Sequence, residues 1–231
     1  MKVTWLGHSA FLLESSRGKR VLTDPWLDNP KSPPGAKELP PADLILVTHG
    51  HSDHLGNTVE LAGKSETKVV CIFEVSLYLQ SNGVAGAMGM NKGGTAHIDG
   101  IGVTMVEAVH SSDIGADGTV VPGGEAAGFV IRFDDGRIVY HAGDTALFGD
   151  MKYIALLYKP DTVLLPIGGY YTMGPREAAK ACELLDPKTI IGMHYGTFPV
   201  LSGSPGELKR HLPSRLKKKV RELEPGRAIE I

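Results

Sequence analysis

The segment Thr48-His49-Gly50-His51-Ser52-Asp53-His54 decides how this 231-residue chain is interpreted. It follows directly on the short, continuous apolar run 44–47, which predicts a strand buried on both faces. Residues two apart in an extended segment point the same way, so His49 and His51 are expected to reach one metal ion from one side. Asp53 and His54 follow a turn at Ser52 and are expected to face a second metal position beside the first. Such a density of imidazole and carboxylate groups predicts a metal site.

Three further donors are placed in the same manner along the chain. His110, Asp144 and His194 each stand where a largely apolar run ends. Ligands converge at strand ends in layered α/β folds. Their recurrence after buried strands therefore predicts that they join the same site.

The order strand, tight turn, strand, aspartate occurs twice in the chain. The four expected strands cover residues 3–13, 20–23, 129–133 and 137–140. The first copy ends at Asp24, and the second copy has a favoured two-residue turn. A glycine-rich segment, 111–127, is expected to be irregular and to separate the copies. The sequence thus predicts two pseudo-repeated halves.

Helices are expected to alternate with strands after each of these hairpins. The expected helices cover residues 57–64, 75–81, 175–185 and 205–218. Strands followed by interleaved helices predict an α/β (α+β) fold with sheets face to face and helices outside. We expect a single domain, 1–231, whose halves span about 1–125 and 126–231.

Composition narrows the classes of function. Lys plus Arg number 24 against 26 Asp plus Glu, and this near-neutral balance argues against a nucleic-acid or anionic-membrane binder. No apolar run approaches the roughly 20 residues of a membrane span, and the N-terminus lacks a signal-peptide pattern. Cys71 and Cys182 lie in apolar segments, so we expect no disulfide and a reducing compartment. A cytoplasmic protein is the resulting expectation.

We call His49-x-His51-x-Asp53-His54 the histidine motif. Together with His110, Asp144 and His194 it resembles the full ligand set of the metallo-β-lactamase superfamily, and the resemblance covers essentially the whole chain. The segments that most resemble one small family of metal-dependent hydrolases are Thr4-Trp5-Leu6-Gly7-His8-Ser9, Thr23-Asp24-Pro25, His141-Ala142-Gly143-Asp144-Thr145 and Met193-His194-Tyr195-Gly196-Thr197. That family is similar to ascorbate-6-phosphate lactonase and to the phospholipase D acting on N-acyl phosphatidylethanolamines. The resemblance implies a four-layer αββα sandwich of the metallo-β-lactamase type, with a dinuclear metal site at one edge between the sheets.

The resemblance also implies a ligand set. The implied ligands are His49, His51 and His110 for a first ion, Asp53, His54 and His194 for a second, and Asp144 as the bridge. We expect two divalent metal ions and favour zinc. Manganese, nickel and iron are alternatives, because these ligands accept several metals. A water shared by the ions would be acidified to a metal-bridging hydroxide. It would cleave a small ester, lactone or phosphodiester, with Asp53 and Asp144 serving catalysis as well as binding.

Two histidines outside the ligand set, His8 and His141, are further catalytic candidates. His8 is expected to meet a substrate anion or to donate a proton to the leaving group. His141, three residues before Asp144, is expected to support the ligands or to face the substrate. A purely structural role stays open for both. Asp24 is expected to be a buried hydrogen-bonding support for the His49 loop. Two histidines without a motif are expected to be incidental: His97 and His211.

Several loops are candidate walls or lids of the pocket. Residues 25–41 and 111–127 are long enough to be functional. Pro166-Ile167-Gly168-Gly169-Tyr170-Tyr171 is expected either to present amides to an anion or to form a plain turn. Tyr195 and Thr197 are expected to shape the pocket beside the last ligand. The expected partner is a small anionic or ester substrate, and a homo-oligomer stays open.

Two other classes of function are weighed against hydrolysis. A non-hydrolytic diiron redox protein of the superfamily would have a glutamate in place of His51 and a flavin domain, and the chain has neither. A catalytically silent metal-binding protein would be expected to lose ligands, whereas all seven are present. Hydrolysis is therefore the favoured interpretation.

Overall fold

The computed structural model of the chain describes residues 1–65, 67–116 and 119–231. The strands of the first sheet are β1 (Lys2–Trp5), β2 (Phe11–Glu14), β3 (Arg20–Thr23), β4 (Leu44–Leu46), β5 (Lys68–Ile72), β6 (Ala87–Met90) and β16 (Ala228–Glu230). Those of the second are β7 (Thr95–Ile98), β8 (Ile101–Glu107), β11 (Ala127–Arg132), β12 (Ile138–His141), β13 (Thr162–Pro166), β14 (Thr189–Met193) and β15 (Val220–Arg221). A separate hairpin pairs β9 (Asp113–Ala116) with β10 (Thr119–Pro122).

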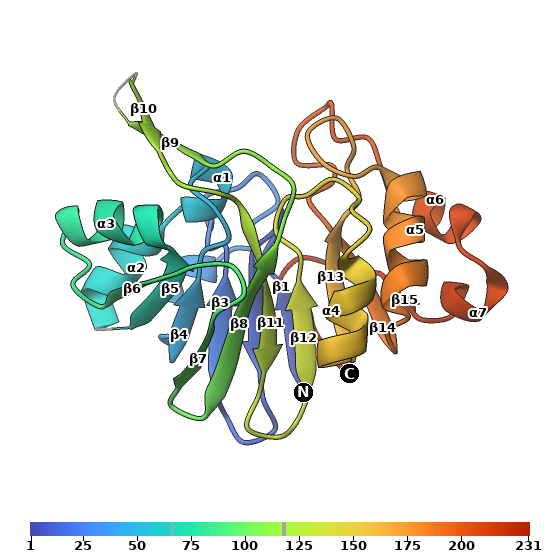
Figure 1. Cartoon of the computed structure of the whole chain (residues 1–231), viewed down its shortest axis with the longest axis horizontal. Coiled ribbons are helices and arrows are strands. Elements are labelled where there is room, and N and C mark those ends of the chain that lie inside the picture. Colours follow the sequence, from blue (N-terminus) through green and yellow to red (C-terminus); the bar gives the residue numbers. More distant parts are fainter. Residues whose placement is uncertain (66, 117–118) are drawn as a thin grey trace.

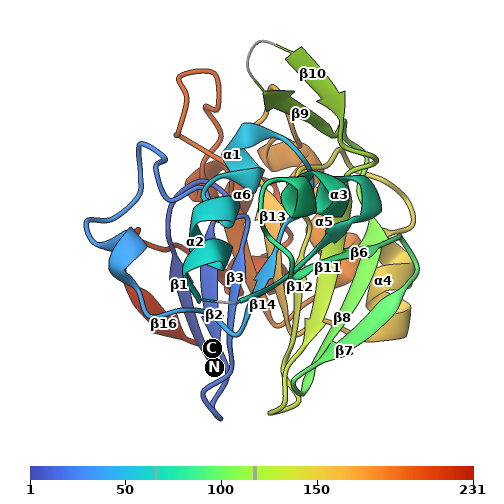
Figure 2. The ribbon, with the colours of Figure 1, turned by 90° about the vertical axis from the view of Figure 1, so that its left-hand side faces the viewer.

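The helices lie outside the two sheets (Figures 1 and 2). They are α1 (Ser52–Leu55), α2 (Thr58–Ser65), α3 (Phe73–Ser81), α4 (Met151–Tyr158), α5 (Pro175–Leu185), α6 (Pro205–His211) and α7 (Ser214–Lys217), with a 3-10 turn, η1, at Ala36–Glu38. In Figure 1, α2 and α3 flank the first sheet, and α4 and α5 flank the second. This arrangement confirms the expected mixed α/β fold, with two sheets face to face and helices outside them.

The two sheets share one pairing plan. Their orders are β16-β1-β2-β3-β4-β5-β6 and β7-β8-β11-β12-β13-β14-β15. In each order the first three pairings are antiparallel and the last three are parallel. The sheets nevertheless exchange strands across residue 125, because β7 and β8 belong to the second sheet and β16 to the first.

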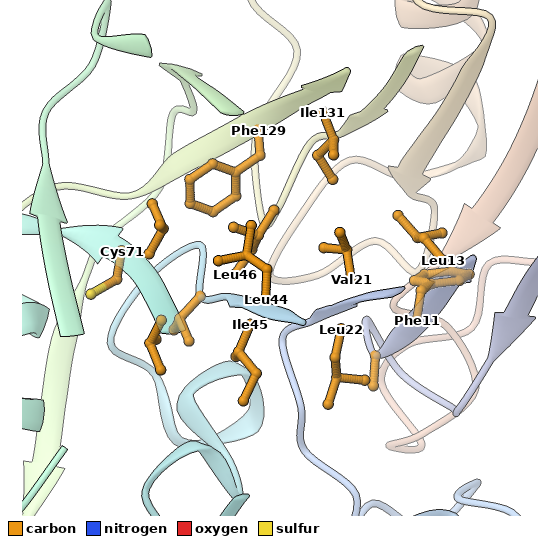
Figure 3. Packing of buried hydrophobic residues seen from close by; sticks show 14 of the residues in the cluster. Phe11, Leu13, Val21, Leu22, Leu44, Ile45, Leu46, Cys71, Phe129 and Ile131 are labelled. Carbon is orange, nitrogen blue, oxygen red and sulfur yellow. The ribbon is translucent and has the colours of Figure 1, made fainter. Parts of the chain in front are cut away.

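The core lies between the facing sheets. Figure 3 shows Leu44 and Leu46 of the first sheet pointing toward Phe129 of the second, whereas Ile45 points the other way, toward the helices. This follows from the alternation of side chains along a strand. All four residues are buried, so β4 is covered on both faces, as its continuous apolar sequence predicts.

The single strand expected over residues 3–13 is wrong, and the correction matters for the site. The chain forms β1 and β2, joined by a turn in which the Leu6 amide donates to Ala10 O at 2.8 Å. Gly7 has φ 90°, which only glycine adopts without strain. This turn places His8 beyond the end of β1.

Two other expectations need correction, and one helix lies where none was expected. The helix expected over residues 205–218 is two helices, α6 and α7, since Pro213 lacks the amide hydrogen that a continuous helix would use. Residues 111–127 contain the β9–β10 hairpin instead of being irregular throughout. The helix α4 was not anticipated from the sequence.

Within the described parts of the chain, every helix is too short or too polar to cross a bilayer.

Candidate metal centre

The candidate ligands lie at one edge of the two sheets. They come from the loops after β4, β8, β12 and β14 and from α1, near the base of the β9–β10 hairpin (Figure 1). Figures 1 and 2 show both chain termini at the opposite end of the molecule. Strand ends of the two sheets thus converge on one region, as the donor positions predict.

One group consists of His49, His51 and His110. One nitrogen from each ring lies within 4.8 Å of the others. His49 Nε2 and His51 Nδ1 are 3.0 Å apart. His49 is buried, and the other two rings are half-buried, so the group opens toward solvent on one side.

A second group consists of Asp53, His54 and His194, joined by His8. One ligand atom from each residue again lies within 4.8 Å of the others. Asp53 Oδ2 is 3.7 Å from His194 Nε2 and 3.9 Å from His54 Nε2. Asp53 is the exposed member of this group, with a side chain that is 23% exposed.

Asp144 lies between the two groups. Its Oδ2 is 2.9 Å from His194 Nε2, 3.3 Å from His54 Nε2 and 3.7 Å from His110 Nε2. His54 and His194 belong to one group and His110 to the other. The structure therefore brings all seven expected donors together, with this carboxylate in the central position.

The hydrogen bonding of the buried donors fits a divalent metal. Within the described chain, His194 Nδ1 and Asp144 Oδ1 are buried without a hydrogen-bond partner, and His54 Nε2 and His194 Nε2 meet only carboxylate oxygens, without good hydrogen-bond geometry. A buried polar atom without a partner costs about 1–3 kcal/mol. Imidazole nitrogens and carboxylate oxygens are the donors that zinc, manganese, iron and nickel accept. The residues present thus fit such an ion.

Electrostatics of the metal-free site show how strongly it attracts positive charge. Burial disfavours the charged ring of His54, but the carboxylates of Asp144, Asp24 and Asp53 outweigh it and raise its pKa well above the usual value. The balance of the same effects raises the pKa of His194 to about 9. Burial also opposes charge on Asp144, yet the neighbouring imidazoles hold its pKa well below normal. The carboxylates therefore favour positive charge at this site, whether it is carried by a protonated ring or by a bound cation.

The pKa values of His49 and His110 are shifted in the opposite direction, below the usual value. Burial lowers the pKa of both rings, more strongly for the fully buried His49. Both rings are therefore neutral near pH 7, which is the form of imidazole that binds metals.

Asp24 supports two of the candidate ligands from beneath. Its Oδ1 accepts the Thr48 amide at 2.8 Å, and its Oδ2 accepts the Thr48 hydroxyl at 2.8 Å. Oδ2 is also 2.7 Å from His54 Nδ1. Thr48 Oγ1 in turn contacts His49 Nδ1 at 3.0 Å. This buried carboxylate therefore orients both His49 and His54, as expected for a ligand support.

His8 lies against Asp53 rather than in the open part of the site. Its Nε2 is 3.0 Å from Asp53 Oδ2, and its Nδ1 is 2.9 Å from Thr197 Oγ1. The ring is fully buried, and burial lowers its pKa to about 4. An ionised carboxylate only accepts, so neutral His8 donates from Nε2 and accepts the Thr197 hydroxyl at Nδ1.

His141 is bound by backbone on both sides of its ring. Its Nε2 is 3.0 Å from Ser9 O, and its Nδ1 accepts the Gly143 amide at 3.2 Å. Among the described residues, the groups of candidate ligands do not include it. His141 therefore connects the turn after β1 to the segment that carries Asp144.

The sequence did not anticipate one contact of the site. Asp113, at the start of β9, has Oδ1 3.0 Å from His51 Nε2. The available signal was a carboxylate three residues after His110, inside a segment that we expected only to wall the pocket.

The remaining candidates lie at the edges of the site or outside it. In the loop after β13, the amides of Ile167, Gly169 and Tyr171 donate to backbone oxygens, so the plain-turn alternative describes them better than an anion cradle. Tyr195 stacks on Trp5 with ring centroids 5.2 Å apart. The two histidines expected to be incidental, His97 and His211, are exposed and lie outside the ligand groups.

Comparisons with known proteins agree with this geometry. A family model described as the beta-lactamase superfamily domain matches residues 2–194. The chain is 50% identical over 227 residues to the UPF0173 metal-dependent hydrolase of Koribacter versatilis, covering 98% of this chain and 96% of that protein. It is also 50% identical over 232 residues to its counterpart in Methanosarcina barkeri, covering 100% and 99%.

A solved structure extends the similarity to three dimensions. Igni18, described as a novel metallo hydrolase from Ignicoccus hospitalis, has a TM-score of 0.86 and 39% sequence identity, covering 100% of this chain and 98% of that one.

Proposed function

Since this chain belongs to the β-lactamase superfamily, and within it to the UPF0173 metal-dependent hydrolases, we propose that it hydrolyses a small ester, lactone or phosphodiester at a dinuclear metal centre. The family supports the coarser statement, a metal-dependent hydrolase. The dinuclear site and the bond that is cleaved are our proposal.

The observation that carries the proposal is the position of Asp144. Its carboxylate lies within 3.7 Å of imidazole nitrogens from both ligand groups. A single bridging carboxylate suits two ions at the roughly 3.5–4 Å separation of two-metal sites. We assign the first ion to His49, His51 and His110, the second to Asp53, His54 and His194, and Asp144 to both.

The protein's own residues would orient the reaction. Two divalent ions would supply a water of lowered pKa and positive charge opposite a developing oxyanion. Asp53 is the most exposed member of its group. We assign it to orient the attacking water as well as to bind metal. The neutral rings of His49 and His110 bring no positive charge that would compete with the ions.

We assign His8 to act through Asp53 rather than on the substrate. Both of its nitrogens are occupied, and the ring is buried, so it holds the Asp53 carboxylate in place. His8→Ala should lower kcat/KM by about 10–100-fold, as loss of an outer hydrogen-bond partner does. Normal metal content together with normal kcat/KM would eliminate this role. His141, bonded only to backbone in our assignment, should affect folding stability more than turnover.

The decisive test is Asp144→Asn, examined with zinc, manganese and nickel. We expect loss of bound metal and of turnover on a panel of bis-p-nitrophenyl phosphate, aryl esters and sugar lactones. The panel identifies the bond type, since only one chemical class should show activity above the metal-free control. Retained binding of two ions with unchanged turnover would reject the assignment of Asp144.

The second candidate function is a diiron redox protein. The imidazole of His51 at the first group argues against it, because the redox members expected from the resemblance carry a carboxylate there. Optical and electron paramagnetic resonance spectra of the protein purified as expressed, recorded before and after reduction and exposure to oxygen, distinguish the two, since a redox centre would give iron signals that change reversibly with oxidation state. Zinc as the native ion, a small anionic or ester substrate and a cytoplasmic location stay predictions.

A further inference from the structure

Asp113 lies outside the seven candidate ligands, yet it contacts one of them directly. We infer that Asp113 is a positioning residue for His51: its carboxylate accepts a hydrogen bond from Nε2–H and so leaves Nδ1 directed toward the place proposed for the first metal. The inference rests on the proposed role of His51 as a ligand of that metal. It adds a residue that neither the motif nor the family comparison identifies.

The two nitrogens of His51 face opposite partners. Nδ1 lies 3.0 Å from His49 Nε2, on the side of the first ligand group. Nε2 lies 3.0 Å from Asp113 Oδ1. An ionised carboxylate only accepts hydrogen bonds, so this contact places the ring proton on Nε2. Nδ1 is then left with the lone pair that a metal requires.

His51 needs such a partner more than the other ligands of the histidine motif. The rings of His49 and His54 are fully buried and are held by Thr48 and Asp24. The His51 side chain is 24% exposed. A half-exposed ring can change rotamer unless a bond holds it. Asp113 is the nearest group that can do so, and Ser111 Oγ lies farther away, at 3.4 Å from Nε2.

The base of the β9–β10 hairpin is fastened so that Asp113 has a defined place. Ser112 Oγ accepts the Gly50 amide at 3.1 Å and donates to Gly123 O at 2.9 Å. A Cβ on Gly50 would lie 2.9 Å from Asp113 O and 2.7 Å from Ile114 Cγ1. The hairpin base therefore packs directly on the peptide between the first two histidines of the motif. Only glycine leaves room for this approach.

The test is the zinc affinity of the full-length protein, measured with a competing chelator. Asp113→Ala should weaken binding of one zinc ion by about 10–100-fold and leave the other unchanged. Asp113→Asn keeps an oxygen that can accept from Nε2, so its affinity should lie between those of wild type and Asp113→Ala. The matched control is Asp135→Ala, which removes a carboxylate that accepts the Ser16 amide in a distant turn. It should bind both ions as wild type does.

Two further variants keep the result unambiguous. The double variant Ser111→Ala/Asp113→Ala removes the hydroxyl that could replace the carboxylate, and wild-type zinc affinity in it would overturn the inference. His51→Ala tests the proposed function instead, because it should lose one ion outright. If His51→Ala binds one ion and the double variant binds two as tightly as wild type, the inference alone fails. If His51→Ala binds both ions normally, the proposed site itself fails.

The melting temperature of the metal-free protein separates positioning from folding. Asp113 has a 45% exposed side chain, so Asp113→Ala should melt with the wild type when both lack metal. If the melting temperature of Asp113→Ala lies below that of the wild type by the same amount without metal as with zinc, Asp113 has a structural role and the positioning role is rejected.

Discussion

In the first sheet β3 is followed by Asp24, and in the second sheet the equivalent strand β12 is followed by Ala142. The Asp24 amide donates to Leu46 O at 2.9 Å, and the Ala142 amide donates to Leu164 O at 3.0 Å. The two bonds occupy the same place in the pairing plan. Asp144 therefore stands two residues farther beyond its sheet than Asp24 does.

This offset separates a supporting aspartate from a candidate ligand. Asp24 lies at the sheet edge, where Thr48 and His54 occupy both of its carboxylate oxygens. Asp144 extends past the edge, and its Oδ1 has no hydrogen-bond partner among the described residues. Both aspartates follow a hairpin in the sequence. The two intervening residues, more than the residue type, decide which of the carboxylates is available to a metal.

The same offset distinguishes His8 from His110. Trp5 pairs with Phe11 in the first sheet, and Met105 occupies the corresponding position opposite Phe129 in the second. His8 is three residues beyond Trp5, whereas His110 is five beyond Met105. The first ring is buried behind Asp53, and the second reaches the first ligand group.

The largest effect that would test this comparison comes from truncating the two aspartates. Asp144→Ala should lose bound metal. Its activity should fall by more than the factor of about 10–100 that is typical when a hydrogen-bond partner of a ligand is removed. Asp24→Ala should instead lower the free energy of unfolding of the metal-free protein by about 3–5 kcal/mol, because it breaks a buried pair. Metal analysis and denaturant unfolding measure the two outcomes. A loss of bound metal in Asp24→Ala as complete as in Asp144→Ala would remove the distinction between candidate ligand and support.

A smaller effect is expected from Gly143, one of the two residues that create the offset. It has φ 61°, and a Cβ there would lie 2.7 Å from Ala127 O and 2.9 Å from Thr48 Cβ. Gly143→Ala should therefore displace Asp144 and weaken zinc binding by at least about tenfold. Gly136→Ala is the control, since Gly136 has φ 86° and nothing within 4 Å of its Cβ position. Both variants should lose some stability to backbone strain. Only weakened zinc binding in Gly143→Ala, and not in Gly136→Ala, would support the offset.

The smallest effect is a pH dependence of the metal-free protein. The folded pKa of His194, about 9, lies above its ordinary value of 6.5. The stability that its proton contributes is complete below about pH 6.5 and is lost as the pH rises toward 9. The pKa of His54 is raised too, so the melting temperature should fall across this window. Removing the carboxylate charge by Asp144→Asn should flatten the fall, and a flat profile in the wild type would contradict the assigned pairing.

Much of the fold follows from local sequence patterns. The continuous apolar run of β4 predicts a strand covered on both faces, and it is buried there. The proline at the start of α5 and the turn between β11 and β12 are equally local signals. By contrast, the break between β1 and β2 was missed, because Leu6 and Ala10 continue an apolar pattern across the turn. The prediction of one continuous helix over 205–218 is wrong, because Pro213 removes a backbone donor and the helix is interrupted there.

Residue identity and order along the chain are enough to predict the chemical types of the donors and their positions after strands. These properties depend on residue identity and on neighbours along the chain. The tertiary structure alone decided which atom meets which partner. Asp113 contacts His51 across 62 residues, and His8 contacts Thr197 across 189. Such contacts depend on strand register and on the packing of one sheet against the other, and a difference of two residues in position separates the supporting Asp24 from the candidate ligand Asp144.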